Sequence, residues 1–233
     1  MSDPSTVVIV GGTRGIGLEI VRHFAGRGDQ VILTGRDQAA AVEAARGVAG
    51  QVTAVALDLA KPKGIEAAFA GVGPVRALVL AAIDRDQNTV ADYSIDRAIN
   101  LATLKLVGYA EVVHVLRSRL TADASIVMFG GIAMYRPYPG STTVSTVNAG
   151  ILGLVRSLVT ELKPVRVNTL HPGIVGDSPY WADKKGALEA TLARTPTGRL
   201  VAMEDIVGAC AFLIDNRSVN GIELLVDGGI YSA

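Results

Sequence analysis

The sequence is poor in the residues that crosslinks and metal sites require. Its 233 residues include one cysteine and three histidines. The cysteine, Cys210, lies in the apolar run 207–213, where a thiol acts as a small buried hydrophobic side chain. His23 and His114 fall within predicted helices and have no second histidine or cysteine at ligand spacing. We therefore expect neither a disulfide nor a metal site.

Net charge and long apolar runs are also lacking. Lys plus Arg and Asp plus Glu number 22 each, and hydrophobic residues make up 49% of the chain. This composition argues against disorder and against a polyanionic partner. No apolar stretch approaches the roughly 18 residues of a membrane helix, and the first apolar run, 7–10, is too short for a signal peptide. We expect a cytoplasmic protein with a small-molecule substrate, no nucleic acid partner and no membrane.

Short apolar runs alternate with stretches of helical periodicity. The runs predict strands at 7–10, 31–34, 52–57, 77–80, 126–129, 165–170 and 222–226. The periodic stretches predict helices at 16–25, 38–48, 65–69, 94–120, 143–162 and 204–214. This alternation predicts one α/β domain over 1–233, with a doubly wound, Rossmann-type parallel sheet of about seven strands and helices on both faces. Segment 173–198 interrupts the alternation and is predicted to be a lid over the substrate.

A glycine-rich loop, Gly-Gly-Thr-Arg-Gly-Ile-Gly at 11–17, follows the first predicted strand and opens the first helix. Glycines there permit a tight turn and a close approach of the backbone to a pyrophosphate, which the helix N-terminus faces. A purely structural turn is the alternative, but the position between strand and helix favours a dinucleotide. The predicted cofactor contacts in the loop are Gly11, Thr13, Arg14, Gly15, Ile16 and Gly17.

The loop resembles the Thr-Gly-x-x-x-Gly-x-Gly motif of the short-chain dehydrogenase/reductase (SDR) family, with Val10 in place of the threonine. The resemblance spans essentially the whole chain. It includes Asp58 and Leu59 after the third strand, which in the family contact adenine. It also includes Pro-Gly at 172–173, Gly-Arg at 198–199 and Val-Asp-Gly-Gly at 226–229. The resemblance implies an oxidoreductase that uses a nicotinamide dinucleotide.

The end of the second predicted strand bears on the choice of cofactor. An acidic residue there would bind the 2′-hydroxyl of NAD and repel a 2′-phosphate, but this chain has Arg36. Arg14 adds a second guanidinium, and in relatives such a pair lies beside the 2′-phosphate of NADP. NADP(H) is therefore favoured over NAD(H). The alternative is that both arginines are solvated surface charges.

This chain lacks most of the catalytic residues of the family at the corresponding positions. The family uses a tyrosine as general acid or base, a lysine four residues later, and a serine that orients the carbonyl. The resemblance places Val144, Asn148 and Gly131 at these positions, respectively, and only the asparagine of the tetrad is matched, by Asn100. Valine has no titratable proton and asparagine has no charge to lower the pKa of a phenol. We therefore expect an atypical member in which standard carbonyl reduction does not run.

Other residues are candidates for the missing proton donor. Tyr138 is the first candidate, with Tyr135 beside it in the same loop; the alternative is that this Tyr-Pro segment forms a wall of the pocket. His171 has the intrinsic pKa of a proton shuttle, but a hydrogen-bonded strand-end histidine is the alternative. Asn100 would serve a proton relay or be structural. Asp177 lies where the family often has a threonine near the cofactor, so its carboxylate either points away or weakens binding.

The sequence is compatible with three functions. The first is an NADP(H)-dependent oxidoreductase with a non-standard active site, acting on a small carbonyl, imine or activated alkene. The second is a non-redox isomerase, cyclase or dehydratase on the same fold. The third is a non-catalytic subunit or cofactor sensor that partners an active relative. In all three, helices 94–120 and 143–162 are expected to form a homo-oligomer, a dimer or tetramer, or a hetero-oligomer with an active relative.

Overall fold

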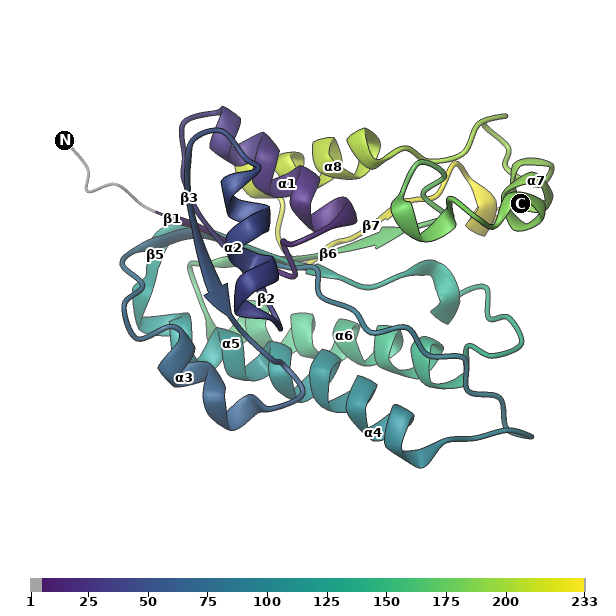
Figure 1. The fold of residues 1–233 in the computed structure, drawn as a ribbon, viewed down its shortest axis with the longest axis horizontal. Coiled ribbons are helices and arrows are strands. Elements are labelled where there is room, and N and C mark those ends of the chain that lie inside the picture. Colours follow the sequence, from purple (N-terminus) through teal and green to yellow (C-terminus); the bar gives the residue numbers. More distant parts are fainter. Residues whose placement is uncertain (1–5, 233) are drawn as a thin grey trace.

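The computed structural model describes residues 6–232, and its centre is a parallel sheet (Figure 1). The strands are β1 (Thr6–Val10), β2 (Gln30–Gly35), β3 (Gln51–Ala56), β4 (Val75–Leu80), β5 (Leu120–Phe129), β6 (Arg166–Pro172) and β7 (Glu223–Val226). Their order in the sheet is β3-β2-β1-β4-β5-β6-β7, and every pair is parallel. The predicted doubly wound fold of one seven-stranded parallel sheet is confirmed.

Helices cover both faces of the sheet (Figure 1). One face carries α1 (Gly15–Gly26), α2 (Gln38–Arg46) and α8 (Met203–Asp215). The other carries α3 (Ile65–Ala68), α4 (Ile95–Ala102), α5 (Tyr109–Leu116) and α6 (Thr142–Glu161). The predicted lid contains a short 3₁₀ turn, η5 (Pro179–Trp181), and α7 (Lys185–Leu192). The remaining turns are η1 (Pro62–Gly64), the π-helical η2 (Thr103–Gly108), η3 (Arg117–Arg119), η4 (Ile132–Met134) and η6 (Ile230–Ser232).

The core consists of two apolar layers, one on each side of the sheet. β1 shows how its sequence serves both, because successive side chains of a strand point to opposite faces. Val8 and Val10 pack in the layer under α5 and α6, whereas Val7 and Ile9 pack in the layer under α1 and α8. Strands buried on both faces have continuous apolar sequences rather than alternating ones. Cys210 is fully buried in the second layer, as predicted.

The structure differs from the predicted elements in three places. The helix predicted at 94–120 is helical from Ile95 to Arg119 but contains the π-helical segment η2, in which both Leu104 and Lys105 are buried. β5 begins at Leu120 rather than at residue 126, because its first half contains polar residues that break the apolar pattern. β6 extends through Pro172 rather than ending at residue 170, so His171 pairs with Leu225 inside the sheet.

Arg166 at the start of β6 ties α8 to the sheet. Its guanidinium donates to the carbonyl oxygens of Leu213, Ile214 and Asn216 at 2.8, 2.6 and 2.8 Å. The last carbonyls of a helix have no partner within it and carry its negative dipole end. One buried cation therefore serves acceptors that the helix itself leaves open.

Two helical segments, Ile95–Arg119 and Thr142–Glu161, are long and apolar enough by composition to cross a membrane. One side of each helical segment packs against the core, where Val112, Leu116 and Ile151 are fully buried. On the outer side of α4, Ile95 and Ile99 are 65% and 59% exposed. The packing of the inner sides explains part of the apolar composition of these helices.

Candidate functional site

A cavity of about 610 Å³ lies at the carboxyl ends of β1, β2 and β4, the edge at which doubly wound sheets bind ligands. Its walls come from the β1–α1 turn, the end of β2, the loops after β3 and β4, and residues 178–180 of the predicted lid. Most of the residues predicted to contact a cofactor line this cavity. They are Gly11, Thr13, Arg14, Gly15, Ile16, Gly17, Arg36 and Leu59.

The glycines of the β1–α1 turn are required by close backbone approaches. Gly11 has φ +89°, and a Cβ on it would lie 2.7 Å from the Cα of Ala82 on the neighbouring chain segment. A Cβ on Gly17 would lie 2.1 Å from the carbonyl oxygen of Gly11. Any side chain at these two positions would therefore displace the backbone and fill the cradle at the start of α1.

The first turn of α1 offers unpaired donors to this cradle. Arg14 is the N-cap residue of α1, with an extended backbone and no side-chain hydrogen bond that caps the helix. The first amide groups of a helix have no partner within it and carry its positive dipole end. With Gly15 and Ile16 lining the cavity, this terminus fits the pyrophosphate of a dinucleotide.

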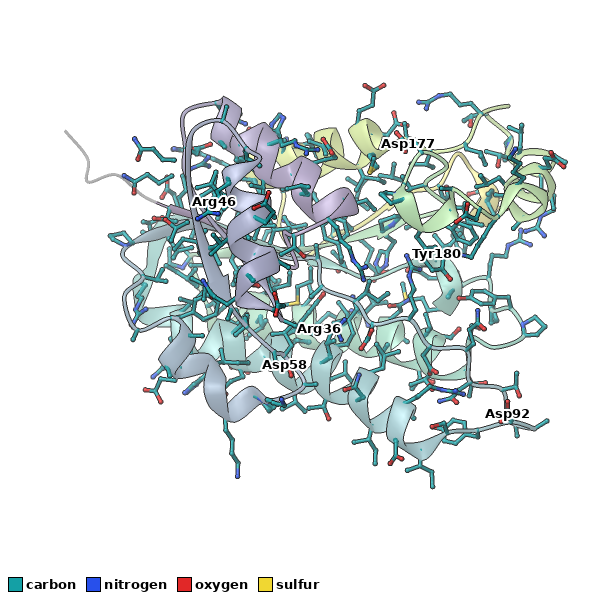
Figure 2. The ribbon with its side chains drawn as sticks, in the orientation of Figure 1. Arg36, Arg46, Asp58, Asp92, Asp177 and Tyr180 are labelled. Carbon is teal, nitrogen blue, oxygen red and sulfur yellow. The ribbon has the colours of Figure 1, made fainter. Side chains whose placement is uncertain are left out.

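Asp58 and Leu59, predicted together as adenine contacts, occupy different surroundings. Leu59 lines the cavity. The Asp58 carboxylate accepts a hydrogen bond from the Ala60 amide at 3.1 Å and lies 3.5 Å from Lys61 Nζ. Figure 2 shows Asp58 below Arg36, near the loop that follows β3. The Asp58 side chain thus holds its own turn, which in turn positions Leu59.

Arg36, the predicted 2′-phosphate ligand, already has an acidic partner. Its Nη1 lies 3.1 Å from Oδ2 of Asp84, which follows β4. The same oxygen accepts a hydrogen bond from Asn100 Nδ2 at 3.2 Å. Asn100, the residue matched to the asparagine of the family tetrad, therefore orients an acid at the cavity wall.

The end of β5 is packed in a way that excludes larger side chains. The amide of Gly131 donates to His171 Nδ1 at 3.1 Å, and Asn148 Nδ2 donates to the Gly131 carbonyl at 3.4 Å. A Cβ on Gly130 would lie 2.4 Å from His171 Nδ1, and one on Gly131 would lie 3.0 Å from Asn148 Nδ2. Val144 is buried beside this group in a small apolar cluster. His171 and Asn148 thus fill the space next to positions 130 and 131.

His171 is fully buried, and its Nδ1 accepts a hydrogen bond, which places the proton of the neutral ring on Nε2. Within residues 6–232, Nε2 of His171 and Oδ1 of Asn148 are buried without a hydrogen-bond partner. Burial lowers the pKa of His171 to about 4. The imidazole is consequently neutral near pH 7 and holds its proton at Nε2.

The two tyrosine candidates differ in how they are engaged. Tyr135 donates a hydrogen bond to Glu223. Burial, and to a smaller extent this hydrogen bond, raises the pKa of Tyr135 to about 12. Tyr138 is 54% exposed, and partial burial raises its pKa. The three candidate catalytic residues are not among the described residues that line the 610 Å³ cavity. Tyr138, His171 and Asn100 are therefore not assembled around it.

The predicted lid contacts the cavity through residues 178–180. The Tyr180 ring packs against two cations, with Arg85 Cζ at 3.6 Å and Lys184 Nζ at 3.5 Å from its centroid. Asp177 points away from the cavity, because its Oδ1 accepts the amide of Met203 at 2.8 Å, at the start of α8 (Figure 2). The repulsion between Asp177 and a pyrophosphate considered from the sequence is therefore avoided.

Sequence reasoning missed a buried charged residue beside the site. Lys105 is 1% exposed; its Nζ donates to the Phe129 carbonyl at 2.5 Å and to Tyr109 Oη at 3.2 Å. Tyr109 in turn donates to the Ala82 carbonyl at 2.7 Å. The pair bridges the ends of β4 and β5, and burial lowers the pKa of Lys105 to about 7. The sequence signal that could have identified it is a single lysine within the apolar stretch of the predicted helix 94–120.

The described residues contain no cluster of side chains that could act as metal ligands. Over residues 6–232, no three His, Cys, Asp or Glu side chains are grouped so that they could hold a metal ion.

Comparisons with known proteins agree with this geometry. Residues 10–231 match the family described as Enoyl-(Acyl carrier protein) reductase. The chain is 30% identical over 232 residues to Carbonyl reductase family member 4 of Danio rerio, covering 96% of each chain. It is also 30% identical to 3-oxoacyl-(acyl-carrier-protein) reductase of Bos taurus, covering 95% of this chain and 96% of the relative. A solved short chain dehydrogenase/reductase family protein superposes with a TM-score of 0.88 at 29% identity, covering 98% of both chains. The chain belongs to the short-chain dehydrogenase/reductase family of nicotinamide-dependent oxidoreductases.

Proposed function

We propose that this chain is an NADP(H)-dependent oxidoreductase with a non-standard active site. The observation that carries the proposal is the uncapped N-terminus of α1, which opens into a 610 Å³ cavity cradled by Gly11 and Gly17. Arg14 and Arg36 line the same cavity, and guanidinium groups bind phosphate through their charge and paired N–H donors. These residues fit the adenosine and pyrophosphate half of the cofactor.

The proposed substrate is a small carbonyl, imine or activated alkene. Carbonyl reductase and 3-oxoacyl reductase are names carried by relatives of the chain. The bound nicotinamide would supply the hydride, so this chain has to bind, orient and provide a proton. Gly131, Val144 and Asn148 carry no acidic proton, and general acid catalysis is typically worth about 10²- to 10⁴-fold in rate. We expect slow turnover, with a proton supplied by water or by Tyr138 rather than by a Tyr-Lys pair.

Oligomerisation through α4 and α6 is part of the proposal. Ile95 and Ile99 are exposed on the outer side of α4, beside the helices that cover one face of the sheet. Ile95 and Ile99 are four residues apart and so lie on one side of α4, and a contiguous exposed apolar patch is typical of an interaction surface. We propose a homodimer or homotetramer in the cytoplasm, built on this surface.

Calorimetric titration of NADPH and NADH into the purified protein tests the cofactor assignment. Arg36→Ala should weaken NADPH binding and leave NADH binding within about twofold, because only NADPH carries the 2′-phosphate. Arg46→Ala is the matched control, since Arg46 is an exposed arginine of α2 that does not line the cavity. Absence of binding of either dinucleotide would overturn the assignment.

Turnover with a panel of small carbonyls, imines and activated alkenes tests the reaction. Oxidation of NADPH by any of these substrates supports the oxidoreductase proposal. Dinucleotide binding with no oxidation across the panel would overturn the redox part and leave a cofactor-binding subunit. Conversion of a substrate without net NADPH consumption would indicate an isomerase or cyclase instead.

A further inference from the structure

The carboxylate of Asp84 occupies the wall of the cofactor cavity beside the predicted 2′-phosphate site. Asp84 follows β4 and Arg36 follows β2, and these strands flank β1 on its two sides. Both side chains line the 610 Å³ cavity. Their contact of 3.1 Å therefore joins the two sides of the cavity above the glycine loop of β1.

This carboxylate is held in place by a second contact. Asn100 of α4 donates to the same oxygen, Oδ2, that faces Arg36. A carboxylate has two oxygens and about four acceptor positions, so Oδ1 remains able to accept a further donor. The side chains of Arg36 and Asp84 are 59% and 35% exposed, so the pair is accessible to a ligand that enters the cavity.

We propose that Asp84 determines how strongly the site discriminates between 2′-phosphorylated and 2′-hydroxyl adenosine ligands. The inference rests on the proposed cofactor function and assigns a specificity role to a residue outside the strand end at which cofactor choice is normally read. Asp84 acts both through its ion pair with Arg36 and through its own charge, so it is a specificity-determining residue.

Two electrostatic effects of Asp84 oppose the binding of a 2′-phosphate. Arg36 has to exchange the carboxylate for the phosphate, so the existing ion pair is lost when the phosphate binds. The dianionic phosphate then lies near the Asp84 carboxylate, and like charges at this separation repel. A 2′-hydroxyl has neither disadvantage, because it can donate a hydrogen bond to a carboxylate oxygen. Asp84 therefore reduces the difference in affinity between NADP(H) and NAD(H) that the two arginines alone would produce.

Adenosine 2′,5′-bisphosphate and adenosine 5′-monophosphate are matched probes that differ only in the 2′-phosphate. Calorimetric titration of both into the wild type and Asp84→Asn isolates the effect. We expect Asp84→Asn to bind the bisphosphate roughly three- to tenfold more tightly, the scale of an exposed ion pair together with a screened repulsion. Binding of the monophosphate should stay within about twofold.

Two further variants make the test specific. Glu43→Gln removes one negative charge from an exposed site on α2 outside the cavity and should leave both affinities unchanged. In the Arg36→Ala background, Asp84→Asn should give a smaller gain than it gives in the wild type, because only the direct repulsion is then removed and no ion pair is released.

The outcomes separate this inference from the cofactor assignment. Tighter bisphosphate binding by Asp84→Asn, with a larger gain when Arg36 is present than when it is absent, supports the role of Asp84. Equal affinities of the wild type and Asp84→Asn for the bisphosphate overturn that role and leave the cofactor proposal intact. Failure of both proteins to bind either probe overturns the cofactor proposal, and the role of Asp84 with it.

Discussion

Replacement of Lys105 by methionine should stabilise the protein in mild acid and lose this benefit in alkali. Methionine has a similar length and flexibility and carries no charge. In the native protein Lys105 is buried between the ends of β4 and β5, with Phe129 and Tyr109 as its hydrogen-bond partners. The variant removes a buried ammonium, but it also leaves the Phe129 carbonyl without this donor.

The magnitude follows from the pKa of Lys105. Burial lowers it from 10.5 to about 7, so the unfolded chain binds the proton more tightly than the folded chain. At about 1.36 kcal/mol per pKa unit, burying the Lys105 ammonium, or removing its proton on folding, costs about 5 kcal/mol at pH 6 and about 2 kcal/mol at pH 9. The lost hydrogen bonds offset this by about 1 to 3 kcal/mol at either pH. The variant should therefore gain about 2 to 4 kcal/mol at pH 6 and little or nothing at pH 9.

Urea unfolding of both proteins at pH 6 and pH 9, followed by circular dichroism, measures the difference. Lys63→Met is the control, since Lys63 is exposed, and should change the free energy of unfolding by less than about 0.5 kcal/mol at both pH values. The reasoning is refuted if Lys105→Met changes the stability equally at the two pH values.

Three other variants test the packing of the fold and of the site. Gly130→Ala should lower the free energy of unfolding by more than about 2 kcal/mol, since its Cβ would lie 2.4 Å from His171 Nδ1; a wild-type midpoint in urea would contradict this. Arg166→Met should cost about 3 kcal/mol or more because buried carbonyls at the end of α8 lose their donor, and hydrogen exchange should rise first in α8. The double variant Val144→Tyr with Asn148→Lys should not gain reductase activity, because the end of β5 still lacks the serine hydroxyl; robust ketone reduction would show that the hydroxyl is dispensable.

The fold could be predicted from the sequence because its signals are local. A strand such as β1, Thr-Val-Val-Ile-Val, is apolar on both faces, and the glycines that follow it are demanded by backbone contacts. The start of β5 was missed because Thr121, Asp123 and Ser125 interrupt its apolar pattern. The π-helical turn around Lys105 was missed because one extra residue in a turn leaves little trace in helical periodicity.

The contacts within the site were less predictable because they join segments far apart in the sequence. Arg36 and Asp84 are 48 residues apart, and Gly131 and His171 are 40 apart. The sequence showed an arginine at the end of β2 but not the acid that faces it. The direction of the Asp177 side chain likewise depends on where α8 begins, which periodicity alone does not fix.

The aromatic pair Tyr180 and Trp181, which packs against Lys184, also gives the protein an optical reporter. The chain contains one tryptophan, Trp181, whose ring lies 5.0 Å from that of Tyr180, which lines the cavity. Tryptophan emission overlaps the absorption of a reduced nicotinamide ring, so energy transfer from this single fluorophore can signal an occupied cavity. The unmodified chain can thus report the arrival of a reduced dinucleotide in the cavity.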